Sequence, residues 1–180
     1  MNIDQFDFNL PEDLIAQHPV NPRHNSKLLS CINSELSDFH FYDLPNILSP
    51  GDVIVVNDTK VLKAKLIGLV NEKKLSFNLH MKNSEDQWYA FCKPAKKCRK
   101  NDEVYFSKFF KAIILEKKDH GEVLLKFNFS GNELLDKISK YGITPLPPYI
   151  KNENLENETH YQTFFAKKIG AVAAPTAGLH

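Results

Sequence analysis

The chain has 180 residues, of which 42% are hydrophobic and 25% charged, with a formal net charge of +1. These values are typical of a soluble globular domain or a domain with an insertion. The longest apolar runs, such as residues 53–56 and 112–115, are far shorter than the roughly 20 residues of a membrane helix. The acidic N-terminus lacks the features of a signal peptide, so we expect no membrane association and a cytoplasmic location.

Cysteine usage and the absence of common motifs exclude several classes of site. Cys31, Cys92 and Cys98 are odd in number and form no Cys-x-x-Cys pair, which argues against a disulfide framework and a zinc site. We expect three reduced thiols. The chain has no P-loop, no Gly-x-Gly-x-x-Gly and no His-Glu-x-x-His motif, so the sequence supports no ATP, dinucleotide or metal site.

Charge is distributed unevenly along the chain. Residues 60–126 contain 16 Lys or Arg and 8 Asp or Glu, whereas the remaining residues contain 7 and 14. The middle is therefore basic and the two flanks acidic, which is typical of a segment that meets a polyanion.

The first 60 residues predict short elements. We expect a short strand near Asp4 and a helical turn over 11–16, then strands over 27–32 and 39–41. A short helix over 42–48 and a turn over 49–52 follow. The run Val53–Val56 is β-branched or aliphatic throughout, which favours a strand buried on both faces.

The next segment has the texture of an all-β module. Alternating strands are expected over 62–70, 75–81, 87–92, 103–106, 109–115 and 122–127, and their spacing indicates a small barrel or sandwich. A helix over 131–141 comes next. Three prolines then predict an extended segment over 142–150 without ladder pairing, and residues 151–160 a polar surface loop.

These elements predict an α/β (α+β) domain that is interrupted by a small antiparallel β-barrel insert. We expect residues 1–60 to form the first part of the α/β domain and residues 61–128 the basic barrel. Residues 129–180 return to the α/β domain.

Polar residues follow directly after the predicted strand at 53–56. Ligand sites favour the carboxyl ends of such strands, so Asp58 could take a proton or bind a ribose hydroxyl, and Asn57 and Thr59 could bind a polar edge. An Asx turn that closes a hairpin explains the same three residues equally well.

Two other polar segments also have both a functional and a structural explanation. Arg23 lies in a proline-flanked loop and suits a carboxylate or phosphate, although a solvated arginine is an equal alternative. The run 93–100 has five positive charges just after Trp88 and Tyr89, which suits phosphate contacts on a barrel. A solvated lysine face is the simpler alternative.

The last eleven residues, Gly170–His180, are mostly Gly and Ala, so another group could approach their backbone closely. Thr176 and His180 are the side chains there with hydrogen-bonding chemistry. An Ala-rich turn that enters a helix at Pro175 is the alternative. Upstream, Tyr161 and Gln162 could be site residues or could cap the preceding loop.

Seven strings together resemble one family, the S-adenosylmethionine:tRNA ribosyltransferase-isomerases of queuosine synthesis. In chain order they are FDFNLPEDLIAQHP, PRHNSKLL, PGDVIVVNDTKV, WYAFCKPAKK, PLPPYI, HYQTFFA and GAVAAPTAGLH. The resemblance implies transfer and isomerisation of the ribosyl group of S-adenosylmethionine onto 7-aminomethyl-7-deazaguanine at the wobble position of a tRNA with a GUN anticodon. The products are epoxyqueuosine-tRNA, adenine and methionine.

The resemblance also implies roles for individual residues. Asp58, His180 and Arg23 become candidate catalytic residues. A candidate S-adenosylmethionine pocket then comprises Asn57, Thr59, Lys60, Pro175, Thr176 and Gly178. The tRNA-binding candidates are Lys93, Lys96, Lys97, Arg99 and Lys100, and no metal is implied.

Members of this family are about twice as long, which leads us to expect a truncated or split form that is inactive alone. A separately encoded C-terminal half is a candidate partner. A non-catalytic remnant or a tRNA-binding module is the alternative.

Overall fold

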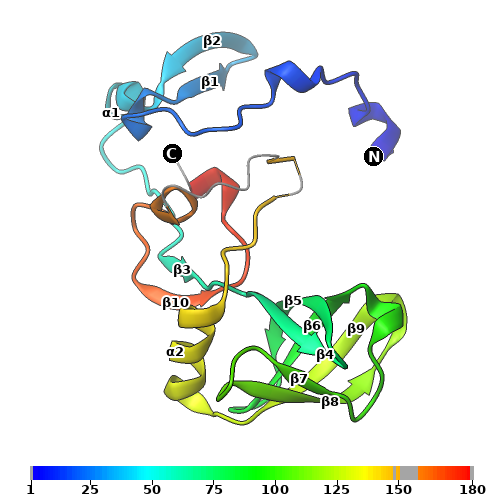
Figure 1. The fold of residues 1–180 in the computed structure, drawn as a ribbon. Helices are drawn as coiled ribbons and strands as arrows, with labels where there is room; N and C mark the ends of the chain where they lie inside the picture. Colours follow the sequence, from blue (N-terminus) through cyan, green and yellow to red (C-terminus); the bar gives the residue numbers. More distant parts are fainter. Residues whose placement is uncertain (1, 148, 151–157, 179–180) are drawn as a thin grey trace. The chain divides into compact units, whose positions relative to one another are not determined.

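A computed structural model describes residues 2–147, 149–150 and 158–178 of the chain (Figure 1). These residues divide into two compact units. The first unit contains the described parts of 1–55 and 147–160, and the second contains 56–146 and 161–178. No helix among the described residues is long and apolar enough to cross a membrane.

The first unit is built around one β-hairpin. Strands β1 (Lys27–Ile32) and β2 (Glu35–His40) pair in antiparallel register through the two-residue turn Asn33-Ser34. Both turn residues have positive φ, 52° and 66°, which matches the right-handed twist of the strands. The other elements are short: η1 (Ile3–Phe6), η2 (Glu12–Leu14), η3 (Arg23–Asn25), η4 (Phe41–Asp43), α1 (Leu44–Ile47) and η7 (Glu158–Tyr161), whose last residue belongs to the second unit.

The described residues of the first unit form no hydrophobic core. Among its described residues only the side chain of Ser26 is buried. Large apolar side chains on several of its segments are exposed, namely Phe6, Phe8, Leu14, Leu29, Leu36 and Val53. Soluble monomeric proteins rarely expose so many large apolar side chains.

Two expectations for this part of the chain were wrong. The residues after Asp4 form the 3₁₀ turn η1 in place of a strand. Residues 53–56 are extended but unpaired, with Val55 91% exposed, because no described strand lies beside them to accept their backbone hydrogen bonds. The expected strand at 27–32, the helical segment after Tyr42 and the turn at 49–52 are confirmed.

The second unit is dominated by a closed antiparallel barrel, drawn in green in Figure 1. Its strands close in the order β4-β5-β6-β9-β8-β7. Their bounds are β4 (Lys65–Val70), β5 (Lys73–Lys82), β6 (Gln87–Lys93), β7 (Glu103–Tyr105), β8 (Lys111–Lys117) and β9 (Glu122–Phe127), with the 3₁₀ turns η5 (Ala95–Lys97) and η6 (Asp119–Gly121) between strands.

Strict alternation of side chains fills the barrel. On β5 the inward residues Leu75, Phe77 and Leu79 are buried, and on β6 Trp88 and Ala90 are buried with them. Intervening residues on both strands point outward, as the two-residue period of a strand requires. The barrel that the sequence predicted is therefore confirmed, and closure leaves no open edge among its six strands.

Helix α2 (Gly131–Tyr141) packs beside this barrel, as the yellow helix of Figure 1 shows. Leu134 and Ile138, one turn apart, are buried within the barrel's hydrophobic cluster. The helix ends at Gly142, and the next residue pairs with Lys65 through two backbone hydrogen bonds of 2.8 and 3.1 Å. The expectation that the segment after the helix makes no ladder contact was wrong at Ile143, which precedes the prolines and keeps its N–H.

A parallel strand pair completes the second unit. Strand β3 (Thr59–Val61) pairs with β10 (Lys168–Ala171), and the chain after β10 continues to the short turn η8 (Thr176–Gly178). Residues more than one hundred positions apart thus lie side by side. The pair brings together two of the segments that the sequence singled out.

Candidate functional site

The segment before β3 is an Asx turn. The side-chain oxygen of Asn57 accepts a hydrogen bond from the backbone N–H of Thr59 at 2.8 Å and another from the Thr59 hydroxyl. These two side chains therefore bond to each other and fix the direction in which β3 begins. The Asx turn that the sequence analysis gave as an alternative for these residues is therefore present.

Asp58 lies at the centre of this turn with its side chain directed outward. Its carbonyl accepts the backbone N–H groups of Lys167 and Lys168 at 2.7 and 3.1 Å. Its carboxylate lies 3.5 Å from the ammonium group of Lys168, in a pair whose side chains are 46% and 80% exposed. Two hydrogen bonds thus hold the Asp58 carbonyl. The carboxylate stays accessible to a ligand, because an exposed ion pair is weak.

Gln162 clamps the end of β3. Its side-chain amide accepts from the N–H of Val61 at 2.8 Å and donates to the C=O of the same residue at 3.0 Å. The amide acts as a one-residue strand, since it satisfies both backbone groups of the buried Val61. These contacts hold β3 in place, which is a role outside the two sequence-based alternatives of a site residue or a loop cap.

Thr163 ties the same region to the turn. Its hydroxyl is buried, donates to the carbonyl of Asn57 at 2.8 Å and accepts from the N–H of Phe165 at 3.0 Å. A methyl group added at Gly178 would lie 3.4 Å from the Thr163 methyl, so η8 runs past Thr163 at contact distance.

Small residues let the terminal segment approach β3. The carbonyl of Ala171 accepts the N–H of Leu62 at 2.8 Å. A Cβ at Gly170 would lie 3.1 Å from the Thr59 methyl, which is tighter than an ordinary contact. The N–H of Gly178 bonds to the carbonyl of Pro175 at 2.8 Å, which sets Thr176 in the turn of η8 with its side chain exposed. His180 lies outside the described residues.

Two further candidates belong to β3 and to the first unit. Lys60 is exposed on β3 opposite Ile169 of β10. Arg23 belongs to the first unit, where its guanidinium donates to the carbonyl of Thr159. Lys168 was not predicted, because nothing in the neighbouring sequence distinguishes it from other surface lysines until the parallel pairing is known.

The basic segment 93–100 is anchored from beneath. Cys98 is fully buried and donates its S–H to the carbonyl of Ala95 at 3.3 Å. The ammonium group of Lys117 reaches the carbonyls of Ala95 and Cys98 at 2.8 and 3.1 Å. The loop backbone is thus fixed, while the side chains of Lys96 and Lys97 are exposed and have no ion-pair partner among the described residues.

The buried Cys92 thiol, which lies beside Cys98, has a shifted pKa. Burial raises the pKa of Cys92 to about 12, and a hydrogen bond with the Cys98 thiol adds to the shift. All three cysteines are free, with Cys31 exposed, which confirms the expectation of reduced thiols. A thiol with so high a pKa is a poor nucleophile at neutral pH.

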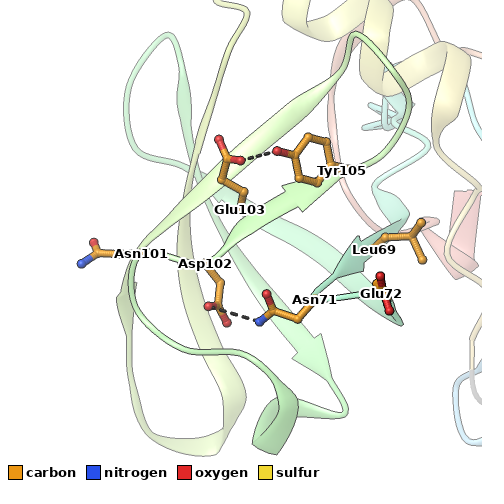
Figure 2. Close-up of a pocket in the computed structure, with 7 residues that line it drawn as sticks. All are labelled: Leu69, Asn71, Glu72, Asn101, Asp102, Glu103 and Tyr105. Carbon is orange, nitrogen blue, oxygen red and sulfur yellow. Dashed lines mark hydrogen bonds between the residues drawn. The ribbon is translucent and has the colours of Figure 1, made fainter.

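A surface cavity of about 500 Å³ lies next to the end of the basic segment, and Figure 2 shows the residues that line it. Its lining includes three carboxylates, those of Glu72, Asp102 and Glu103. Two of them are engaged: Asp102 accepts the N–H of Arg99 at 2.8 Å, and Glu103 accepts the Tyr105 hydroxyl. The hydrogen bonds of Asp102 and Glu103 brace the backbone around the cavity.

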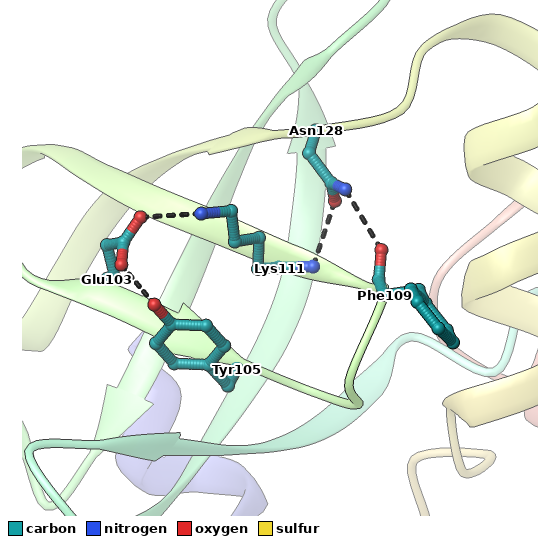
Figure 3. A network of polar contacts seen from close by, with 5 residues as sticks. All are labelled: Glu103, Tyr105, Phe109, Lys111 and Asn128. Carbon is teal, nitrogen blue, oxygen red and sulfur yellow. Dashed lines mark hydrogen bonds and ion pairs between the residues drawn. The ribbon is translucent and has the colours of Figure 1, made fainter.

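A network of polar contacts, shown in Figure 3, braces the β7–β8 hairpin in the same way. The ammonium group of Lys111 donates to Glu103 at 2.8 Å, and the Asn128 amide links the N–H of Lys111 to the carbonyl of Phe109 at 2.9 and 3.0 Å. The bond from Lys111, and then that from Tyr105, lowers the pKa of Glu103 below its usual value. The network is a structural clamp at the barrel edge, exposed to solvent throughout.

Taken together, the geometry of the second unit offers two surfaces with chemistry. One is the strand pair around Asp58, with an accessible carboxylate beside closely packed small residues. The other is the anchored basic segment 93–100. No three His, Cys, Asp or Glu side chains within the described ranges converge as a metal site would require.

Comparison with known proteins assigns the chain to one family. Residues 3–180 match the sequence profile of a family described as queuosine biosynthesis protein. The curated proteins of Brucella ovis, Brucella canis and Brucella suis named S-adenosylmethionine:tRNA ribosyltransferase-isomerase are 45% identical to it over 196 aligned positions. The alignment covers 100% of this chain and 54% of each relative, so the chain spans about half the length of the curated relatives it matches.

A solved structure is also similar. The crystal structure of the S-adenosylmethionine tRNA ribosyltransferase of Thermotoga maritima is 29% identical, covers 77% of this chain and is itself covered to 48%, with a TM-score of 0.40.

Proposed function

Because the chain belongs to the queuosine biosynthesis protein family, we propose that it supplies the N-terminal half of an S-adenosylmethionine:tRNA ribosyltransferase-isomerase. The observation that carries the proposal is the parallel pairing of β3 with β10. It joins the segment around Asp58 to the small-residue segment that ends in η8, and the sequence singled out these two segments separately.

The reaction transfers the ribosyl group of S-adenosylmethionine to the exocyclic amine of 7-aminomethyl-7-deazaguanine in tRNA. The sulfonium acidifies the neighbouring C5′ proton, so a base removes it and adenine leaves. The amine of the tRNA base then attacks the resulting electrophile. Epoxide closure breaks the C–S bond and expels methionine. The work of the protein is to supply the base, hold the sulfonium and exclude water.

Asp58 is the proposed base. Its backbone is fixed by two hydrogen bonds and its carboxylate is accessible, as a group that must reach a bound substrate requires. Pro175, Thr176 and Gly178 form the wall beside it, with His180 further along the chain as a second candidate. Asn57 and Thr59 hold the turn, Lys60 extends along β3, and Arg23 is the candidate for the methionine carboxylate.

The basic segment 93–100 is the proposed contact for the tRNA backbone, in a tRNA with a GUN anticodon. Five cations in eight residues on a fixed loop provide phosphate contacts without a large ordering cost. Lys93, Lys96, Lys97, Arg99 and Lys100 carry these charges.

We further propose that turnover needs the C-terminal half that the curated relatives have beyond the aligned region. The support is the absence of a hydrophobic core among the described residues of the first unit, with Val55 91% exposed. Burial of such side chains drives association.

The test measures adenine release from S-adenosylmethionine by the chain mixed with the C-terminal half of the Brucella ovis relative. Asp58→Asn should lower the rate roughly 100-fold or more, as expected for loss of a general base. Lys168→Ala is the matched control, since it removes the ion-pair partner and leaves the carboxylate. An unchanged rate in Asp58→Asn would remove its catalytic role, and tRNA binding without any adenine release would favour a binding module.

A further inference from the structure

The outer face of β5, β6 and β9 carries a group of aromatic side chains that the proposed function does not use. Tyr89 and Phe91 alternate with the buried residues of β6 and therefore point outward. His80 lies beside them on β5, and Met81 pairs across from Tyr89 at a strand irregularity. We call His80, Met81, Tyr89 and Phe91 the aromatic face.

The rings of this face are ordered by contacts with one another. The His80 and Phe91 rings stack with centroids 4.5 Å apart and planes 21° apart. His80 and Tyr89 lie 6.3 Å apart with their planes tilted by 31°. Despite this packing, Phe91 remains 46% exposed and Met81 51% exposed. The stacked Phe91 ring is thus held at the surface, with the exposed Met81 on the neighbouring strand.

Charged groups lie beside two rings of the aromatic face, those of His80 and Tyr89. The Nε2 atom of His80 is buried 3.0 Å from a carboxylate oxygen of Glu122, at an angle outside hydrogen-bond geometry. The other oxygen of Glu122 lies 3.2 Å from the ammonium group of Lys118, which sits 4.1 Å from the centre of the Tyr89 ring. One carboxylate therefore orients a ring and a cation together, and the cation covers Tyr89.

The surroundings of the face are cationic. Lys93 is the next outward residue after Phe91 on β6 and is exposed at the start of the basic segment. Lys118 borders the opposite side through Tyr89. A rigid, partly exposed ring between two cations matches a nucleotide, whose base stacks and whose phosphates are negative. Binding of an apolar protein segment would not require lysines on both sides of the rings.

We propose that the aromatic face is a stacking platform for an unpaired base of RNA, with Phe91 as the ring that receives the base and Lys93 as the adjoining phosphate contact. The inference rests on the proposed function for the identity of the RNA as tRNA. It adds a single-strand contact to the backbone contacts of the basic segment. Paired bases are inaccessible to such a ring, so the platform selects unpaired nucleotides.

The test measures dissociation constants by fluorescence anisotropy for an RNA hairpin with an unpaired loop and for a fully paired RNA duplex. Phe91→Ala should weaken hairpin binding roughly tenfold and leave duplex binding and the salt dependence unchanged. Phe91→Leu keeps apolar bulk without a ring face and should weaken it similarly, whereas Phe91→Trp should restore it. Lys93→Ala should lower the slope of log K against log salt by about one for both RNAs.

Phe109→Ala is the matched control, because Phe109 is also an exposed ring on the barrel and lies at the β7–β8 turn. Its loss should change neither dissociation constant. Hairpin binding that stays within about twofold in both Phe91→Ala and Phe91→Leu would overturn the platform while leaving the tRNA partner in place. An equal loss on the duplex would also overturn it. Failure of the wild-type chain to bind either RNA would overturn the platform and the RNA partner together.

Discussion

Side chains in this protein form hydrogen bonds with backbone groups that the strand pairs leave without a partner. Gln162 satisfies both backbone groups of Val61, a residue that is 3% exposed. Gln162→Leu leaves both groups without partners, so we expect the free energy of unfolding to fall by about 1–3 kcal/mol. Urea unfolding measures this, with the exposed Gln5→Leu as the control. Equal stability of the two variants would contradict the clamp.

Cysteine ionisation provides a second test at the residue scale. Because the pKa of Cys92 is raised to about 12 in the folded chain from 9.0, folding is favoured by the protonated thiol. This contribution is fully present below pH 9 and is lost as pH rises from 9 towards 12. We expect the free energy of unfolding to fall more steeply over this range in the wild type than in Cys92→Ala, as measured by urea unfolding at each pH.

Thiol labelling tests whether Cys92 and Cys98 are buried in the native chain. At neutral pH the exposed Cys31 should react promptly with a disulfide reagent, while Cys92 and Cys98 should react only on unfolding. Equal reaction rates for all three thiols in the native chain would contradict the buried pair.

At the scale of elements, the end of α2 depends on one glycine. A Cβ at Gly142 would lie 1.9 Å from the carbonyl oxygen of Lys63 and 2.5 Å from that of Ile138. Both are backbone atoms, so Gly142→Ala must displace the helix end and its bridge to β4; we expect a loss of about 3 kcal/mol or more. Thermal unfolding measures it. The exposed helical change Ser139→Ala should be neutral, and equal effects of the two would contradict the packing.

The basic segment gives a functional prediction at the same scale. Replacing Lys96, Lys97, Arg99 and Lys100 with Ala should weaken tRNA binding and reduce the slope of log K against log salt by about three to four. The loop should keep its shape, because Cys98 and Lys117 anchor its backbone. The paired change Lys73→Ala with Lys74→Ala, at the β4–β5 turn, is the control. An unchanged slope would exclude the segment from the interface.

The sequence predicts those elements whose partners lie nearby in the chain. Strand β9 and helix α2 have the bounds that the residue pattern predicts, because alternation and a helical apolar stripe are local signals that the barrel then uses. The run at Val53–Val56 carries an equally strong strand signal and is unpaired. A strand needs a neighbour, and no residue pattern within the run reveals whether one is present.

The candidate site shows the same limit. The sequence singled out the segments around Asp58 and around Thr176, but their contact depends on the parallel pairing of β3 with β10, across more than one hundred residues. The clamp role of Gln162 and the ion pair between Asp58 and Lys168 follow from that pairing. Neither has a local signature.

Over the whole molecule, charge and burial separate the two units. The basic segment 60–126 lies within the second unit, which also holds the closed barrel and its hydrophobic cluster. The described part of the first unit has exposed apolar side chains and no such cluster. This contrast predicts that the barrel unit unfolds as one cooperative body, whereas the first unit gains stability from a partner.

The most direct test of the account follows ribose-labelled S-adenosylmethionine into tRNA that carries 7-aminomethyl-7-deazaguanine. The chain alone should transfer no label, and the chain with the C-terminal half of the Brucella ovis relative should transfer it, less so when Asp58 is replaced by Asn. Transfer by the chain alone would contradict the need for a second half. Absence of transfer from the mixture, with both parts folded and bound to each other, would contradict the proposed activity itself.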